Sequence, residues 1–198
     1  SQYVLENTTI KTVLDKYNNH KPVEWALVKL KTISEIEDEE VLHLDYDIVW
    51  KYDLNIVLDA FRKSEFDVIY QKTESLMIPY YRVFFYNNKD KRGIFNGFKR
   101  RVAFNAGVSY FKTKEVRSLI NKWLDFSSEK FGDYVSLEQV LIPNDIERSG
   151  YKVGTLVDFI RTLPLVKNSL KFDGSQAISK EVYNELCKHC NFIQNLGF

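Results

Sequence analysis

The chain has 198 residues, of which 44% are hydrophobic and 28% are charged, and its net charge is +1 at pH 7. This composition is ordinary for a soluble globular protein, and the length predicts one domain, residues 1–198, with a substantial core. The near-neutral charge provides no general attraction to nucleic acid or to a membrane surface. No apolar run reaches the length of a transmembrane helix, and no signal peptide is visible. The two cysteines give no disulfide framework and fit a reducing compartment, so we expect a cytoplasmic protein.

The first part of the chain alternates between helical and extended patterns. Strands are expected at residues 3–5, 41–49 and 67–70, and helices at 10–17, 23–34 and 54–61. An acidic turn at residues 35–40 leads into the second of these strands. The alternation predicts an α/β fold, with a mixed central sheet flanked by helices.

The second part of the chain is richer in aromatic residues and turns. Strands are expected at residues 80–86, 101–104 and 107–111, and helices at 113–124, 137–141 and from 179 onward. Thr113 is the expected cap of its helix, and Pro143 is expected to end the short helix before it. Residues 158–165 fit a strand or a helix equally well. No repeat or linker indicates a second domain.

Two carboxylates, Asp45 and Asp47, lie where the chain leaves the apolar strand at residues 41–49. Side chains two apart on a strand point to one face and lie roughly 7 Å apart. Burying two unpaired acids would cost several kcal/mol, so they need a cation or a solvated edge. Carboxylate oxygens suit Mg²⁺ or Mn²⁺, whereas the alternative is an Asp pair that caps the helix beginning at Leu54.

Two later stretches carry further polar groups. Residues 104–111 read Phe-Asn-Ala-Gly-Val-Ser-Tyr-Phe, and residues 137–141 read Leu-Glu-Gln-Val-Leu. Gly107 lets the backbone approach a ligand closely, and Asn105 offers a donor and an acceptor for hydroxyl groups. The alternative is a Gly bulge with Asn105 in a turn. For Glu138 and Gln139, the alternative is a solvated helix N-terminus.

These three stretches, with Lys29-Leu30 on the helix before the Asp-x-Asp strand, resemble GT-A-fold glycosyltransferases of the glycogenin-like and galactosyltransferase-like kind. The resemblance covers roughly residues 23–143. It implies a single-domain GT-A-like (Rossmann-like) fold and a metal-dependent enzyme. That enzyme would move a sugar from a nucleotide-diphosphate donor, expected to be a UDP-sugar, to a glycan, protein or other hydroxyl acceptor. The glycogenin-like character leans towards retention of anomeric configuration, and the implied cofactor is Mn²⁺ or Mg²⁺.

The resemblance also implies roles for individual residues. Glu138 would act as a general base or hold the acceptor, and Gln139 would support the positive charge at the reacting carbon. Asp47 would bind the metal directly, Asp45 would lie on the ribose side or share the metal, and His189 would be a possible third ligand. The donor-binding residues would be Lys29, Asp45, Tyr46, Asp47, Asn105, Ala106 and Gly107.

Two expected features of the resemblance are missing. The late His-x-x-Gly-x-x-Lys stretch is not visible, and only 44 residues precede Asp45. We therefore expect that the N-terminal nucleotide-binding part is shortened, or that the sequence begins late. A non-catalytic glycan-binding or assembly protein on the same fold is the first alternative function. A sugar-nucleotide pyrophosphorylase is the second, although residues 1–21 lack the Gly-rich basic loop that it usually carries.

Three other features have competing interpretations. His43 shares a strand face with the two aspartates, so a metal triad is geometrically feasible, but we favour a His packed deeper in the sheet. Cys187 and Cys190 lie on an apolar helix stripe and are interpreted as small buried thiols. The basic run at 89–101 fits a loop closing on donor phosphates, a patch for an anionic acceptor, a single-strand nucleic-acid surface or a solvated hairpin. The neutral net charge disfavours nucleic acid.

Overall fold

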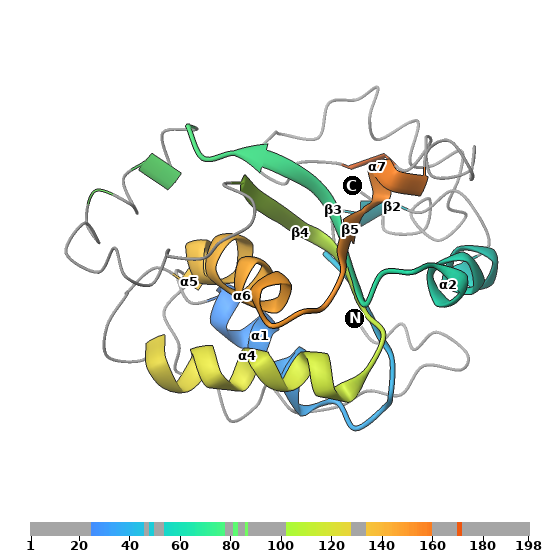
Figure 1. Ribbon diagram of the computed structural model, residues 1–198, viewed down its shortest axis with the longest axis horizontal. Helices are drawn as coiled ribbons and strands as arrows, with labels where there is room; N and C mark the ends of the chain where they lie inside the picture. Colours follow the sequence, from blue (N-terminus) through green and yellow to red (C-terminus); the bar gives the residue numbers. More distant parts are fainter. Residues whose placement is uncertain are drawn as a thin grey trace, which may run out of the picture.

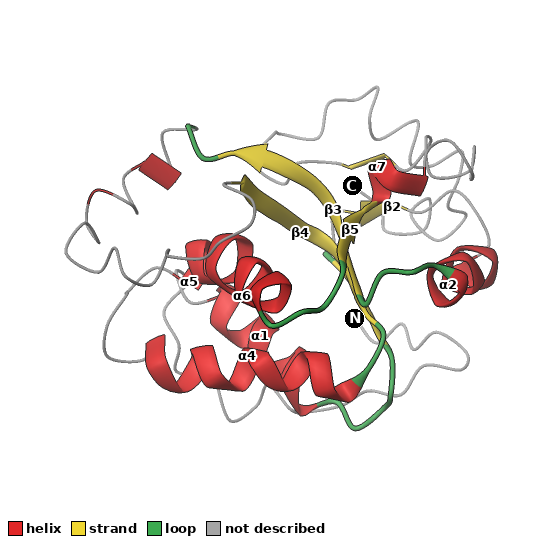
Figure 2. Ribbon diagram, viewed as in Figure 1, coloured by secondary structure: helices red, strands yellow, loops and turns green. Residues whose placement is uncertain are grey.

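The computed structural model describes residues 25–45, 48–49, 54–77, 81–82, 86, 102–127, 134–159 and 170–171. Figures 1 and 2 show how these parts are arranged. The helices are α1 (Trp25–Glu35), α2 (Leu54–Lys63), α4 (Lys114–Ser127), α5 (Tyr134–Ser136), the π-helix η4 (Leu137–Leu141), α6 (Ile142–Arg148) and α7 (Leu156–Phe159). The strands are β1 (Val41–Leu44), β2 (Ile48–Val49), β3 (Val68–Ser75), β4 (Val102–Phe111), β5 (Val153–Thr155) and β6 (Leu170–Lys171).

Four strands form one sheet in the order β1-β4-β3-β5. Strand β4 is antiparallel to both β1 and β3, whereas β3 and β5 are parallel. The two short strands β2 and β6 pair separately and antiparallel. The prediction of an α/β fold with a mixed central sheet is therefore confirmed.

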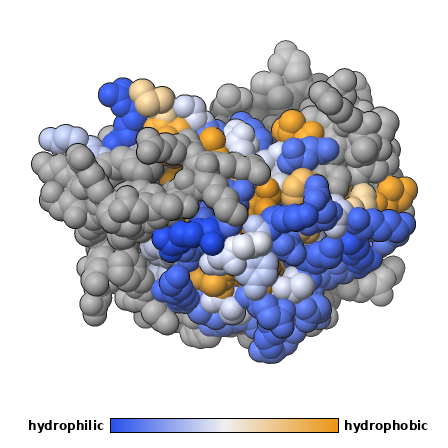
Figure 3. Space-filling view, viewed as in Figure 1, coloured by the Kyte–Doolittle hydropathy of each residue, from blue (hydrophilic) through white to orange (hydrophobic). Residues whose placement is uncertain are grey.

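Helices cover both faces of this sheet (Figure 1). On one face, α1, α4, η4 and α6 pack on Val68, Tyr70 and Phe104. On the other face, α2 and α7 pack on Ile69 and other strand residues. Because successive strand residues point to opposite faces, Ile69 and Tyr70 enter different clusters. On the face in Figure 3, the described hydrophobic residues form separate small patches among hydrophilic ones.

Strand β4 is bulged beside the place where the predicted site residues lie. Tyr70 pairs with Ser109 and Lys72 pairs with Asn105, so residues 106–108 of β4 lie opposite the single residue Gln71. A bulge of this kind bends a strand and redirects its side chains, and such bulges occur often beside functional sites. It places Gly107 between β1 and β3.

A buried arginine fixes the acidic turn that leads into β1. Arg117 on α4 is 1% exposed, and its guanidinium donates to the backbone carbonyls of Glu39 at 2.7 Å, of Ile36 at 3.0 Å and of Asp38. Satisfying these carbonyls holds the turn against α4, so α4 indirectly positions the start of β1.

Several predicted helices and strands are confirmed. Helices α1, α2 and α4 lie where apolar periodicity placed them, and β3 begins at Val68, one residue after the expected start, and extends to Ser75. The hydroxyl of Thr113 accepts a hydrogen bond from the backbone N–H of Val116 at 3.4 Å, in agreement with its expected capping role.

Other predictions were wrong. The strand expected at 41–49 is divided, because Ile48–Val49 pairs with β6 rather than with the main sheet. The strands expected at 101–104 and 107–111 are one continuous strand, because β4 is hydrogen-bonded on both sides. Tyr81, Arg82 and Tyr86 are helical rather than extended. Pro143 does not end a helix but lies in the first turn of α6, where a missing N–H is tolerated.

Some predictions lie outside the described residues. They are the strand at residues 3–5, the helix at 10–17, Tyr46 and Asp47, the basic run at 89–101, and the last helix with Cys187, His189 and Cys190. Within the described part of the chain, no helix has the length and apolar character needed to cross a membrane.

Candidate functional site

The centre of the site is the ammonium group of Lys29, which projects from α1. Its Nζ atom lies 2.5 Å from Glu138 Oε1 and 3.1 Å from Asp45 Oδ1. It also donates to the backbone carbonyl of Ala106 at 3.4 Å. The Lys29 and Glu138 side chains are 7% and 3% exposed. Lys29 therefore joins α1, the end of β1, the bulge of β4 and η4 through one buried cation.

The two carboxylates determine the charge state of Lys29. Burial by itself lowers the pKa of an amine, but the charges and hydrogen bonds of Glu138 and Asp45 outweigh it, so the pKa of Lys29 is raised. Lys29 is therefore fully protonated at neutral pH. A buried ammonium between two carboxylates is a fixed positive charge beside the bulge of β4.

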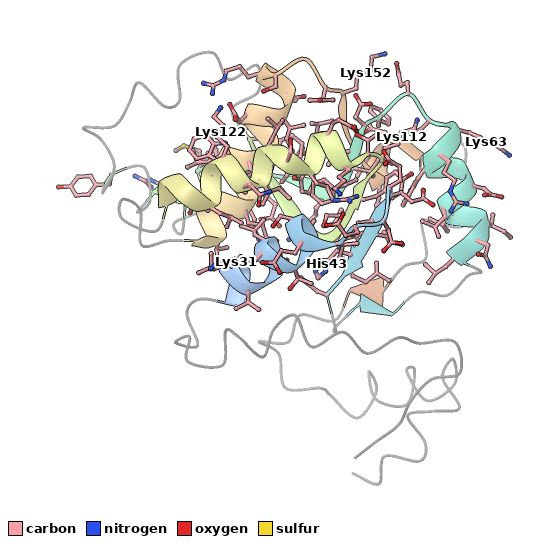
Figure 4. The ribbon with its side chains drawn as sticks, turned by 90° about the horizontal axis from the view of Figure 1, so that it is seen from below. Lys31, His43, Lys63, Lys112, Lys122 and Lys152 are labelled. Carbon is pink, nitrogen blue, oxygen red and sulfur yellow. The ribbon has the colours of Figure 1, made fainter. Side chains whose placement is uncertain are left out.

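Asp45 directly follows β1 and is held from several sides. Its backbone N–H donates to the carbonyl of Gly107 at 2.8 Å, which continues the β1–β4 pairing. His43 Nε2 lies 2.9 Å from Asp45 Oδ1, the same oxygen that Lys29 contacts. Figure 4 shows His43 beside α1. Burial raises the pKa of Asp45, but the hydrogen bond from His43 and the charge of Lys29 together outweigh burial, so the pKa is lowered and the carboxylate is ionised.

A second hydrogen-bond network connects β4, β3 and η4. Asn105 Nδ2 donates to Glu74 Oε1 at 2.9 Å, and Asn105 Oδ1 accepts from the backbone N–H of Gly107 at 3.1 Å. The Tyr81 hydroxyl donates to Glu74 Oε2 at 3.0 Å and also contacts the side-chain amide of Gln139. Burial raises the pKa of Glu74, but the Asn105, Tyr81 and Lys72 contacts lower it more, so its pKa lies below the usual value.

Oxygen atoms surround the position that a side chain at Gly107 would occupy. A Cβ atom there would lie 2.8 Å from Gln71 Oε1, 3.2 Å from Asn105 Oδ1 and 3.4 Å from Asp45 Oδ2. The first distance is too short for a carbon atom, so a side chain at this position would have to displace the end of Gln71. The absence of a side chain lets three acceptor oxygens from β1, β3 and β4 face one point.

The structure brings together seven of the predicted site residues: Lys29, Asp45, Asn105, Ala106, Gly107, Glu138 and Gln139. The alternative interpretation of Gly107, a glycine bulge, agrees with the backbone, although Asn105 lies within a strand rather than in a turn. The alternative of a solvated Glu138 is wrong, because Glu138 is 3% exposed and paired with Lys29. His43, 24% exposed and bonded to Asp45, is not packed deep in the sheet.

Three residues of the site were not predicted from the sequence: Gln71, Glu74 and Tyr81. Gln71 and Glu74 lie beyond residue 70, where the strand was expected to end. One sequence signal could have identified Glu74. If the strand continues past residue 70, alternate residues share a face, and Glu74 then lies on the face of Tyr70. Nothing in the sequence pattern connects Tyr81 with Gln139.

A divalent cation is implied by the resemblance, and Asp45 is the one described residue that the resemblance names as a ligand for it. Asp45 contacts Lys29 and His43 through Oδ1, whereas Oδ2 faces Gly107. No group of three or more His, Cys, Asp or Glu side chains within the described ranges is arranged to hold a metal ion. Any further ligands would have to come from residues outside those ranges.

Comparison of the chain with protein-family models, with curated proteins and with solved structures finds no match. The functional argument therefore depends on the chemistry of the residues that meet around Lys29 and Gly107.

Proposed function

We propose that the chain is a metal-dependent glycosyltransferase that moves a sugar from a UDP-sugar donor to a hydroxyl acceptor, with retention of anomeric configuration. The observation that carries the proposal is the meeting of Lys29, Asp45, Asn105 and Glu138 at one bulged strand. These residues come from four different helices and strands. Their convergence agrees with the order of motifs that suggested sugar transfer.

The chemistry of the reaction explains why these residue types belong together. Transfer breaks the bond between the anomeric carbon and the diphosphate oxygen, and the acceptor oxygen forms a new bond to that carbon while it loses its proton. Charge develops on the departing diphosphate, so a fixed positive charge nearby lowers the barrier. Lys29 is already paired with Glu138 and Asp45, so the neutralising charge would come from Mn²⁺ or Mg²⁺ held by Asp45 and Asp47.

The surrounding polar groups would orient the sugar. Asn105 and Gly107 lie beside Asp45, and a glycine places no side chain of its own between the backbone and a ligand. Gln139 belongs to the network of Tyr81 and Glu74, which holds its amide near the same side of β3. In this arrangement Glu138 fixes Lys29, and Gln139 is the better placed residue of the pair to reach a ligand.

A second candidate function is binding of a nucleotide sugar or glycan without transfer. One observation favours it: Glu138, the expected base, is buried and engaged by Lys29. A carboxylate held in this way does not take a proton from an acceptor unless Lys29 moves away. A pyrophosphorylase has no comparable support in the contacts of the site.

Calorimetry with UDP and UDP-sugars in the presence of Mn²⁺ tests the proposal. We expect binding by the unmodified chain, and a loss of tenfold or more in Asp45→Asn, on the order of 1.4 kcal/mol. Asp47→Ala should have the same direction of effect. Transfer would release UDP when an acceptor is present and free sugar when it is absent, whereas binding alone would release neither.

The matched control is Asp59→Asn on α2, which packs on the opposite face of the sheet and whose side chain is 58% exposed. This variant makes the same chemical change far from Lys29 and should bind UDP-sugars like the unmodified chain. If neither UDP nor any UDP-sugar binds the unmodified chain with Mn²⁺ present, the proposal is wrong.

A further inference from the structure

Gln71 on β3 stands out because its polar end is buried without a partner. Its Oε1 atom is shielded from solvent and accepts no hydrogen bond from the described part of the chain. A buried acceptor without a donor is costly, so native proteins rarely keep one without a reason. The atom lies opposite the bulge of β4, where the regular ladder between β3 and β4 is interrupted.

The unpartnered oxygen faces the same point as two other acceptors. Gln71 Oε1, Asn105 Oδ1 and Asp45 Oδ2 lie 2.8, 3.2 and 3.4 Å from the Cβ position of Gly107. Asn105 Oδ1 already accepts from the backbone of Gly107, and Asp45 Oδ2 is a carboxylate oxygen. A group entering here meets acceptors, so it has to bring hydrogen-bond donors or positive charge.

We propose that Gln71 determines which sugar the site accepts, by taking a hydrogen bond from one hydroxyl of the donor sugar over Gly107. The inference rests on the proposed function and names one contact within that site. Sugar hydroxyls supply donors to neutral amide oxygens such as Gln71 Oε1. A site that hydrogen-bonds a hydroxyl rejects analogues that lack it, because its own polar atom is then left buried and unpaired.

A cation is the competing occupant, since oxygen atoms also bind metal ions. The position of the three oxygens favours the sugar. Gln71 Oε1 and Asn105 Oδ1 are neutral amide oxygens, and Asn105 Oδ1 is already engaged, so only Asp45 adds charge. The Cβ position of Gly107 lies only 2.8 Å from Gln71 Oε1, so this oxygen is close against the backbone of β4, which disfavours a hydrated ion.

The experiment compares the unmodified chain with Gln71→Met, which keeps the length of the side chain and removes the acceptor. Affinities for UDP, UDP-glucose, UDP-galactose and UDP-N-acetylglucosamine are measured with Mn²⁺, together with deoxy analogues of the preferred sugar. We expect Gln71→Met to weaken binding of the preferred UDP-sugar about tenfold and to leave UDP binding unchanged. The deoxy analogue that lacks the hydroxyl bound by Gln71 should bind the unmodified chain weakly. Its affinity should be no lower for Gln71→Met, because the contact is already missing.

Two further variants separate a functional effect from a structural one. Because Gln71 Oε1 has no partner in the described part of the chain, Gln71→Met should melt at the same temperature or higher. Thr73→Val, an exposed change two positions along β3, is the control and should keep the sugar preference. Gly107→Ala places a methyl group against Gln71 and should reduce UDP-sugar binding selectively.

The outcomes are distinguishable. If UDP-sugars bind the unmodified chain and Gln71→Met keeps the same preference, the inference about Gln71 is overturned while the proposed function stands. Weaker binding of Mn²⁺ alone by Gln71→Met would also overturn it and assign the oxygens to a cation. If no UDP-sugar binds the unmodified chain, both the proposed function and the inference fail.

Discussion

Replacing Lys29 by Met is the sharpest test of the electrostatic centre. The substitution keeps an unbranched side chain but removes the ammonium that lies 2.5 Å from Glu138 Oε1 and 3.1 Å from Asp45 Oδ1. Glu138 is 3% exposed, so its carboxylate would remain buried without its cation. Breaking a buried ion pair by removing one partner costs about 3–5 kcal/mol, and we expect a destabilisation of this size at neutral pH.

The double variant Lys29→Met/Glu138→Gln separates the cost of the orphaned charge from other effects. With Glu138 neutral, the buried site contains no unpaired carboxylate from η4. We therefore expect the double variant to be more stable than Lys29→Met alone by about 2 kcal/mol. Asp45 keeps its hydrogen bond with His43 and is 26% exposed, so it tolerates the loss of Lys29 better.

Urea unfolding followed by circular dichroism measures both free energies. The matched control is Lys152→Met, which removes a lysine that lies 2.7 Å from Glu65, with both side chains largely exposed. Solvent screens that pair, so the control should unfold at nearly the same urea concentration as the unmodified chain. If Lys29→Met lowers the free energy of unfolding by less than about 1 kcal/mol, the reasoning is refuted, because solvent-exposed ion pairs contribute that little.

Three further predictions concern stability. Trp123→Phe should cost about 1.5–3 kcal/mol in urea unfolding, because Asp145 Oδ2 is buried and loses the indole N–H that donates to it at 2.9 Å. Arg117→Met should lower the free energy of unfolding by at least about 2 kcal/mol and increase amide exchange in the turn at 36–39, since three backbone carbonyls lose their donor. The pKa of Asp45 is lowered in the folded chain, so its contribution to stability is present above the usual value of 3.8 and is lost as the pH falls below it. The stability difference between the unmodified chain and Asp45→Asn should therefore shrink from about pH 5 to about pH 2, and a difference independent of pH would contradict this assignment.

The sequence predicted those parts of the fold whose burial pattern is local. Apolar periodicity identified α2 through Val57 and Phe61, which are both buried. The division of the strand after Leu44 depends on pairing with β6, which lies more than a hundred residues later, and no local pattern carries that information. The helical Tyr81 contacts Glu74 and Gln139 through its hydroxyl, and no local pattern carries information on these contacts either.

The sequence predicted which residues form the candidate site better than it predicted which of them contact each other. Motif order placed Asp45, Asn105 and Glu138 in one site, but it gave Glu138 a role towards an acceptor. The structure instead pairs Glu138, in the first turn of η4, with Lys29 of α1. Gln71 was not predicted as a site residue, because its position in the site depends on the bulge of β4. That bulge is a feature of the register between two strands.

The most direct measurement is a crystal structure of the chain soaked with Mn²⁺ and the preferred UDP-sugar. The account predicts the sugar over Gly107, with one hydroxyl on Gln71 Oε1 and the diphosphate on the side of Asp45 and Lys29. A UDP-sugar bound elsewhere, with the contacts around Lys29 and Gly107 unchanged, would contradict the central claim.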